Sequence, residues 1–205
     1  MTIHTAQTLL GLLLKGGWLM FPLGLLSLIS LYIIAERLFT YRKYLNFSSS
    51  FLEEIDEALQ HADTSKIKQI CTEQDNLIAK VIRKGIEQRQ AANFTLIVEN
   101  ESSRVVSFLE EKLSALATIS GAAPMIGFLG TVTGMIQTFM AIAQEKHQLS
   151  SQVFSSGIYE AMVTTVAGLM VGIIAYLGYN YCVAKVHKAT VRLSYLVNLL
   201  LAKMG

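Results

Sequence analysis

Three long runs without a charged residue divide this 205-residue chain into apolar and polar stretches. The runs lie between Lys15 and Glu36, between Lys112 and Glu145, and between Glu160 and Lys185. A helix that crosses a bilayer needs about 20 predominantly apolar residues, so each run is long enough to do so. The pattern therefore predicts an all-α integral membrane protein with three transmembrane helices. We place these helices at residues 16–36, 113–144 and 157–184.

The polar stretches predict further helices outside the bilayer. Residues 37–112 form the longest stretch, and three short apolar stripes at helical spacing indicate amphipathic helices that pack on one another. Helical apolar spacing continues from this stretch into the second span without Pro or Gly, so we predict one helix from about Thr95 to Ala143. The third span is predicted to continue in the same way through 185–205. The second and third helices would thus extend into a cytoplasmic helical bundle.

Two shorter segments complete the expected domain order. Residues 1–15 are predicted to form an amphipathic periplasmic segment at the membrane surface. Residues 145–156 are predicted to form a short periplasmic connection. The first span could instead be a cleaved signal peptide. Only Lys15 precedes it as a cation, and no small-residue cleavage site follows, which favours an uncleaved anchor.

Composition and charge define the class of protein and its orientation. With 52% apolar residues, 16% charged residues and a mean hydropathy of +0.45, an ordinary soluble domain is excluded. Eleven Lys and Arg residues lie within 37–112 and four within 185–205, against only Lys15 and Lys146 elsewhere. Because cytoplasmic loops carry the excess of cations, we predict a periplasmic N-terminus and a cytoplasmic C-terminus.

No arrangement of residues in the sequence supports catalysis. Cys71 and Cys182 fall on the predicted reducing side of the membrane, and the four histidines have no ligand spacing. The long polar stretch has no glycine-rich phosphate loop. We therefore expect no enzymatic activity, no cofactor, no metal ion and no nucleic-acid partner.

The second and third spans each carry a face of small and hydroxylated residues. In the second span, Gly127, Thr131, Gly134 and Thr138 follow one another at steps of four, three and four, with Pro124 nearer the helix start. In the third span the face comprises Ala161, Thr165, Gly168, Gly172 and Ala175. Such faces let helices pack closely, and they can also line a narrow polar path.

Both uses of these faces lead to predictions. The residues expected to serve helix packing are Pro124, Gly127, Gly134, Gly168 and Gly172. A single three-span chain cannot fully bury both faces, so the sequence predicts assembly into a closed ring. A hydroxyl in the middle of each span favours a shared polar path beside the packing contacts.

Glu160 is the carboxylate that borders the small-residue face of the third span, with Thr164 one helical turn further on. At the water interface it would be an ordinary boundary charge. If it were buried, keeping it ionised would be costly, and it would suit the uptake and release of protons. Thr131 and Thr165 could then hold a chain of water molecules beside it.

The segments Gly121–Phe139 and Gly157–Leu169 closely resemble the two pore-helix motifs of the ExbB/TolQ/MotA proton-channel family. The three-span order and the large cytoplasmic loop extend the resemblance over nearly the whole chain. It implies a homopentamer in the bacterial inner (cytoplasmic) membrane whose second and third helices line a central pore. The polar pore positions that it implies are Thr131, Glu160 and Thr165. Thr138 and Thr164, on or beside the same faces, complete the candidate proton pathway.

The resemblance also implies partners. An ExbD-like or TolR-like dimer of single-span subunits would occupy the pore and bring the aspartate that is protonated and released. A TonB-like or TolA-like protein and membrane lipid are the other expected partners. An ExbB-like role, using the proton motive force for TonB-dependent outer-membrane transport, is favoured. A TolQ-like subunit of the Tol-Pal system is the first alternative, and a non-conducting membrane scaffold is an alternative of a different class.

Overall fold

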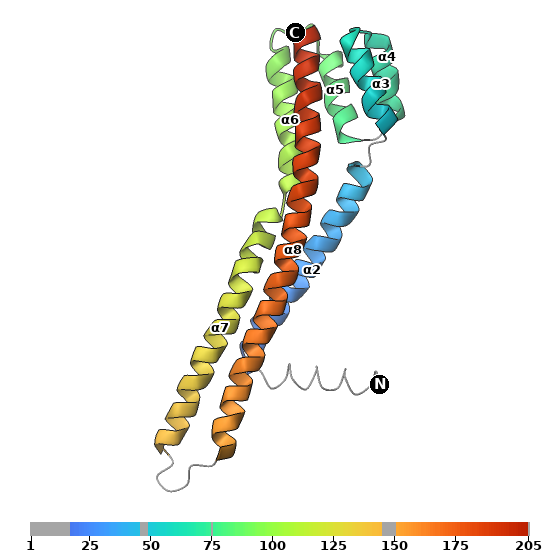
Figure 1. The fold of residues 1–205 in the computed structure, drawn as a ribbon. Helices are drawn as coiled ribbons and strands as arrows, with labels where there is room; N and C mark the ends of the chain where they lie inside the picture. Colours follow the sequence, from blue (N-terminus) through green and yellow to red (C-terminus); the bar gives the residue numbers. More distant parts are fainter. Residues whose placement is uncertain (1–16, 46–48, 75, 145–150, 205) are drawn as a thin grey trace, which may run out of the picture. The chain divides into compact units, whose positions relative to one another are not determined.

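The computed structural model describes residues 17–45, 49–74, 76–144 and 151–204, and this part of the chain is helical without a strand. Its helices are α2 (Met20–Tyr44), α3 (Ser49–Gln60), α4 (Thr64–Glu73), α5 (Leu77–Glu87), α6 (Phe94–Glu110), α7 (Leu113–Gln144) and α8 (Ser151–Met204) (Figure 1). Three helical stretches are long and apolar enough to cross a membrane: Met20–Tyr44, Phe94–Ala143 and Gly157–Met204. The all-α, three-span prediction is therefore confirmed.

Two predicted segments fall partly or wholly outside this description. The amphipathic segment at 1–15 lies outside the described residues, as do positions 145–150 of the predicted periplasmic connection. The remainder of that connection belongs to α8, which begins at Ser151. The third apolar helix thus begins six residues before the predicted start of the span, which is residue 157.

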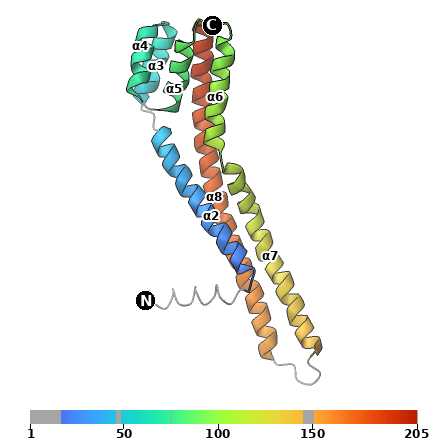
Figure 2. The same ribbon diagram turned by 180° about the vertical axis from the view of Figure 1, so that it is seen from behind.

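The chain divides into two compact units, of which the first combines residues up to Ile34 with Ser114–Tyr179. In it the start of α2, most of α7 and the first half of α8 run side by side, as both ribbon views show (Figures 1 and 2). Its buried contacts form two small clusters, one around Ile33, Leu116, Ile119 and Ala175 and one around Met20, Leu23 and Ala123. Large apolar side chains cover much of its outer surface, as suits helices surrounded by lipid or by other membrane helices.

The second unit combines Ala35–Leu113 with Asn180–Gly205. The predicted apolar stripes of α3, α4 and α5 form its core, together with buried residues of α6 and α8. Gly85 shows how closely three of these helices meet. A Cβ atom built at Gly85 would lie 2.8 Å from a methyl carbon of Leu200 in α8 and 3.0 Å from one of Val98 in α6. Asp63 and Asn76 accept hydrogen bonds from the first backbone amides of α4 and α5 and so fix where these helices begin.

The predicted continuous helix from Thr95 to Ala143 is wrong, because the structure breaks it between α6 and α7. Lys112 has a φ of 63°, in the left-handed region that ends a helix. The break leaves carbonyl groups at the end of α6 without helical hydrogen-bond partners, and two side chains of α2 donate hydrogen bonds to them. Arg37 donates to the carbonyl oxygen of Phe108 at 3.0 Å, and the Tyr41 hydroxyl donates to that of Leu109 at 2.8 Å.

Ion pairs surround the same break. The Arg37 guanidinium, only 1% exposed, lies 3.1 Å from a carboxylate oxygen of Glu111, and Lys112 Nζ lies 2.8 Å from one of Glu36. A buried guanidinium needs several acceptors, and here the helix end supplies one carbonyl and the flanking residues supply carboxylates. The helix break and the buried arginine therefore stabilise each other.

Candidate functional site: the α7–α8 pair and the Glu160 recess

The small-residue faces of α7 and α8 pack against each other within one chain. A Cβ atom built at Gly168 would lie 2.6 Å from the carbonyl oxygen of Ala123 and 2.8 Å from the Cα atom of Gly127. One built at Gly134 would lie 3.0 Å from the Cβ atom of Ala161. The two backbones thus approach so closely that side chains larger than hydrogen do not fit at the tightest point.

Pro124 contributes to the same contact from inside α7. A Cβ atom at Gly172 would lie 2.5 Å from Cγ of its ring and 3.1 Å from the carbonyl oxygen of Ser120. Proline has no amide hydrogen, so it cannot donate to the carbonyl four residues before it, which is that of Ser120. Gly172 therefore leaves room for both the proline ring and this carbonyl.

This arrangement weakens one premise of the sequence-based argument for a ring, although Thr131, Gly134 and Thr165 stay partly exposed. That argument held that one chain cannot fully bury both small-residue faces, and here the two faces cover each other over most of their residues. The side chains that remain exposed on the first unit are large and apolar, among them Phe128, Phe139, Met162 and Ile173. These residues provide most of the surface that other subunits or lipid can contact.

The predicted threonines all donate to backbone carbonyl oxygens. Thr165 bridges the two helices, because its hydroxyl donates to Gly127 at 2.9 Å. The other three bond within their own helices: Thr131 to Phe128 at 2.6 Å, Thr138 to Gly134 at 2.8 Å and Thr164 to Glu160 at 3.0 Å. Each hydroxyl oxygen retains lone pairs that can accept a hydrogen bond from water or another donor. Thr138 and Thr164 are buried, whereas Thr131 and Thr165 are partly exposed.

Glu160 lies at a small recess of about 40 Å³ in the first unit. A water molecule needs roughly 10–15 Å³, so the recess can hold water. Its polar lining comes from both helices of the pair, and its other walls come from the start of the described chain. The lining residues are Gly17, Trp18, Leu19, Gly130, Thr133, Gly134, Gln137, Glu160 and Thr164.

The recess brings together only part of the predicted pathway. Glu160 and Thr164 line it, and Thr131, Thr138 and Thr165 do not. Two polar residues that the sequence analysis did not single out, Thr133 and Gln137, line it from α7. The sequence spacing could have indicated them. Thr133 and Gln137 follow Gly130 by three and seven residues, which places all three on one face of the helix, and Gly130 packs against Thr164.

Gly17 is a second residue that the sequence analysis missed at this site. It has a φ of 69°, and a Cβ atom there would overlap a carboxylate oxygen of Glu160. The absence of a side chain at Gly17 therefore lets the carboxylate lie against the backbone. No sequence signal connects two residues so far apart in the chain, because only tertiary packing brings them together.

These features define a class of protein: a helical membrane protein whose two glycine-paired spans carry several hydroxyls and one carboxylate beside a recess large enough for water. Residues 73–194, more than half of the chain, match the MotA/TolQ/ExbB proton channel family. The chain belongs to that family.

Three relatives illustrate the match. The "ExbB-like 1" biopolymer transport protein of Synechocystis is 32% identical over 176 residues, which cover 83% of this chain and 69% of the relative. The Tol-Pal system protein TolQ of Haemophilus influenzae is 38% identical over 78 residues, 38% of this chain and 34% of the relative. The biopolymer transport protein exbB1 of Vibrio cholerae is 27% identical over 172 residues, 79% of this chain and 73% of the relative.

Proposed function

We propose that this protein is the proton-channel subunit of an energy-transducing complex in the bacterial inner membrane, and that it conducts without catalysing a covalent reaction. The observation that carries the proposal is the Glu160 recess, which lies on the helix pair that the family match covers. A carboxylate beside a space for water can attract protons and pass them on. The proposed topology has a periplasmic N-terminus and a cytoplasmic C-terminus, as the distribution of cations indicates.

The proposed assembly is a homopentamer with a single-span dimer of the ExbD or TolR type in its pore. The resemblance supports it, and so do the large apolar side chains exposed on α7 and α8, which a neighbouring subunit could cover. The partner would contribute the aspartate that takes up and releases the proton, since the described parts of the spans contain no aspartate. Glu160 would set the negative potential near it, and Thr131 and Thr165 would orient water.

An ExbB-like role in TonB-dependent outer-membrane transport is our first assignment. It is supported by the longer matches, to ExbB-like 1 and exbB1, which run over most of this chain. A TolQ-like role in the Tol-Pal system is the second candidate, and the higher identity over the shorter TolQ match favours it. Complementation of strains that lack either system, each supplied with its own single-span partner, distinguishes the two roles.

Proton flux into liposomes tests the proposal itself. Vesicles that contain this protein with its single-span partner should acidify when a potassium diffusion potential is applied, and vesicles with either protein alone should acidify much less. A scaffold role, favoured by the fact that the predicted threonines donate to backbone carbonyls, predicts no flux from the full complex. Absence of flux from a correctly assembled complex would therefore reject the channel function in favour of the scaffold.

A further inference from the structure

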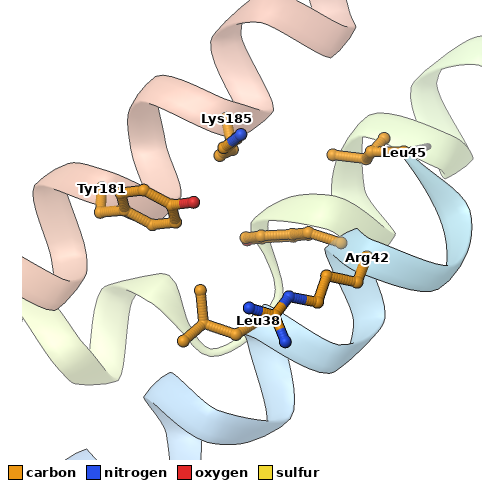
Figure 3. A pocket seen from close by; sticks show the side chains of 6 residues that line it. Leu38, Arg42, Leu45, Tyr181 and Lys185 are labelled. Atoms are coloured by element: carbon orange, nitrogen blue, oxygen red, sulfur yellow. The ribbon is translucent and has the colours of Figure 1, made fainter. Parts of the chain in front are cut away.

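A cavity of about 380 Å³ lies between α2 and α8 in the second unit. Leu38 and Arg42 line it from α2, Leu45 lines it just after the end of α2, and Tyr181 and Lys185 line it from α8 (Figure 3). The ring of Tyr41 forms a further wall. Its volume falls within the roughly 300–1,000 Å³ of small-molecule sites. It takes no part in the Glu160 recess, which is formed by other residues.

The residues that line this cavity carry two positive charges, on Arg42 and Lys185, and no negative one. Within the described part of the chain, no carboxylate forms an ion pair with Arg42 or Lys185, although Arg37 nearby on α2 is paired with Glu36 and Glu111. Two exposed cations without an ion-pair partner, facing one cavity from two helices, favour an anionic occupant.

The two tyrosines help to indicate which kind of anion the cavity can bind. Lys185 Nζ lies 5.5 Å from the ring centre of Tyr181, which holds the cation beside the cavity. The hydroxyl of Tyr41 is already used in its bond to Leu109, so this residue offers only the face of its ring. Tyr181, by contrast, is half-exposed and directs its hydroxyl toward the cavity in Figure 3. The cavity thus offers a guanidinium, an ammonium and a phenol, which are three donors suited to phosphate oxygens.

The apolar part of the lining indicates that the anion carries a hydrocarbon chain. Two leucines line the cavity, Leu38 in α2 and Leu45 directly after the end of this helix. Arg42 lies six residues beyond the first predicted span, where arginine and aromatic residues meet lipid headgroups. In the proposed topology this is the cytoplasmic leaflet, whose surface is rich in anionic lipids.

We propose that this cavity binds the phosphodiester headgroup of an anionic phospholipid, with Arg42, Lys185 and Tyr181 on the phosphate and Leu38 and Leu45 beside the first part of an acyl chain. A soluble organic phosphate has the same phosphate group but no acyl chain that would contact the two leucines. The proposal does not depend on proton conduction, since it would hold equally for a scaffold.

Native mass spectrometry of the full-length protein in detergent tests this site. Phosphatidylglycerol should remain bound at concentrations at which phosphatidylcholine does not. The double variant R42Q/K185Q should weaken phosphatidylglycerol binding by about tenfold or more, because both cations that face the cavity are lost. The matched control is K43Q/K188Q, which removes the same charge from exposed positions on the same two helices outside the cavity, and it should bind nearly as the parent does.

Three results would overturn the proposal. Equal retention of the two lipids by the parent protein would show that the site does not select an anionic headgroup, and this comparison does not rely on any variant. Equal weakening in the two double variants would show general attraction to basic surface charge. Displacement of phosphatidylglycerol by an equal concentration of sn-glycerol 3-phosphate would show that the occupant is a soluble phosphate. Retention of binding in the charge-preserving variant R42K/K185R, with loss in R42Q/K185Q, supports it.

Discussion

The hydroxyl of Thr165 in α8 donates a hydrogen bond to the carbonyl oxygen of Gly127 in α7, with the two oxygens 2.9 Å apart. The bond lies beside the tightest contact of the two backbones, since a Cβ atom at Gly127 would be 3.1 Å from the Cα atom of Gly168 and 3.2 Å from that of Thr165. Thr165 was predicted as a pore residue, and here it also joins the helix pair. A loss of function at this position can therefore have a structural cause, and the experiments below separate the two.

Replacing Thr165 by Val should destabilise the helix pair, whereas replacing it by Ser should not. Valine has the shape of threonine without the donor, and such hydrogen bonds between membrane helices contribute about 0.6 kcal/mol and at most about 1.7 kcal/mol. Unfolding in mixed micelles with increasing dodecyl sulfate measures this difference. If Thr165→Val reduces proton flux while its unfolding curve matches that of Thr165→Ser, the hydroxyl acts on the proton path and not on packing.

Gly168→Ala should destabilise α7–α8 packing by about 1–3 kcal/mol, the usual cost of overpacking. Its methyl group would lie 2.6 Å from the Ala123 carbonyl oxygen, and a backbone atom cannot rotate away. Gly121→Ala is the matched control, because it lies in α7 and a Cβ atom there meets no atom within 4 Å. The same unfolding assay compares them, and equal stability of the two variants would contradict the packing described here.

Glu160→Gln should abolish energised function while leaving the protein folded and assembled. Glutamine keeps the size of the side chain and removes its charge, whose effect is amplified in a medium of low dielectric constant. The loss should exceed that of Thr131→Val or Thr165→Val alone. Growth that depends on energised outer-membrane uptake, at verified protein abundance and partner association, is the measurement. Full growth of Glu160→Gln would remove this residue from the proposed pathway.

Gly17→Ala should impair the same function without changing any charge. The added methyl group would overlap the Glu160 carboxylate, and the left-handed backbone at Gly17 disfavours alanine. Gly24→Ala, in α2 and with no atom within 4 Å of a Cβ atom built there, is the control and should grow normally. Comparable growth of the two variants would mean that the position of the carboxylate is not important.

Arg37→Gln should destabilise the second unit by about 2 kcal/mol, because it leaves the Phe108 carbonyl and the Glu111 carboxylate without their donor. We place the cost below that of a fully buried ion pair because Glu111 is half-exposed. Lys66→Gln breaks an exposed pair with Glu57 and should cost less than about 1 kcal/mol. Thermal unfolding followed by circular dichroism compares the two variants.

Cysteine labelling tests the orientation, but Cys71 itself cannot report it. Its side chain is 2% exposed, and burial raises the pKa of its thiol to about 12, against 9.0 for a free thiol. At pH 8 this lowers the thiolate fraction about a thousandfold, so Cys71 should stay unlabelled from either side of the membrane and become reactive only on unfolding or as the pH approaches 12. The exposed Lys68, replaced by Cys in a Cys71→Ala and Cys182→Ala background, is the better probe.

In intact cells an impermeant maleimide should label a cysteine at Ser150 and not one at Lys68, and permeabilised cells should label both. Ser150 lies in the predicted periplasmic connection, outside the described residues. Labelling of the Lys68 position in intact cells would reverse the orientation inferred from the eleven cations of residues 37–112.

The sequence by itself determined the number of apolar helices, the amphipathic stripes of α3, α4 and α5, and the family. These features depend on the order of apolar and polar residues along a single helix, which is a local property. It also located the small-residue faces, because glycine at steps of three and four leaves a groove on any helix.

Only the tertiary structure decided what those faces meet and where the helices end. The groove at Gly168 could have received another subunit, but Gly127 of the same chain fills it. The break at Lys112 follows no Gly or Pro signal, because it is stabilised by donors from Arg37 and Tyr41, about seventy residues away in the chain. Gly17 likewise meets Glu160 only through folding. Long-range contacts of this kind produce no periodic pattern in the sequence, so they cannot be predicted from the spacing of apolar and polar residues.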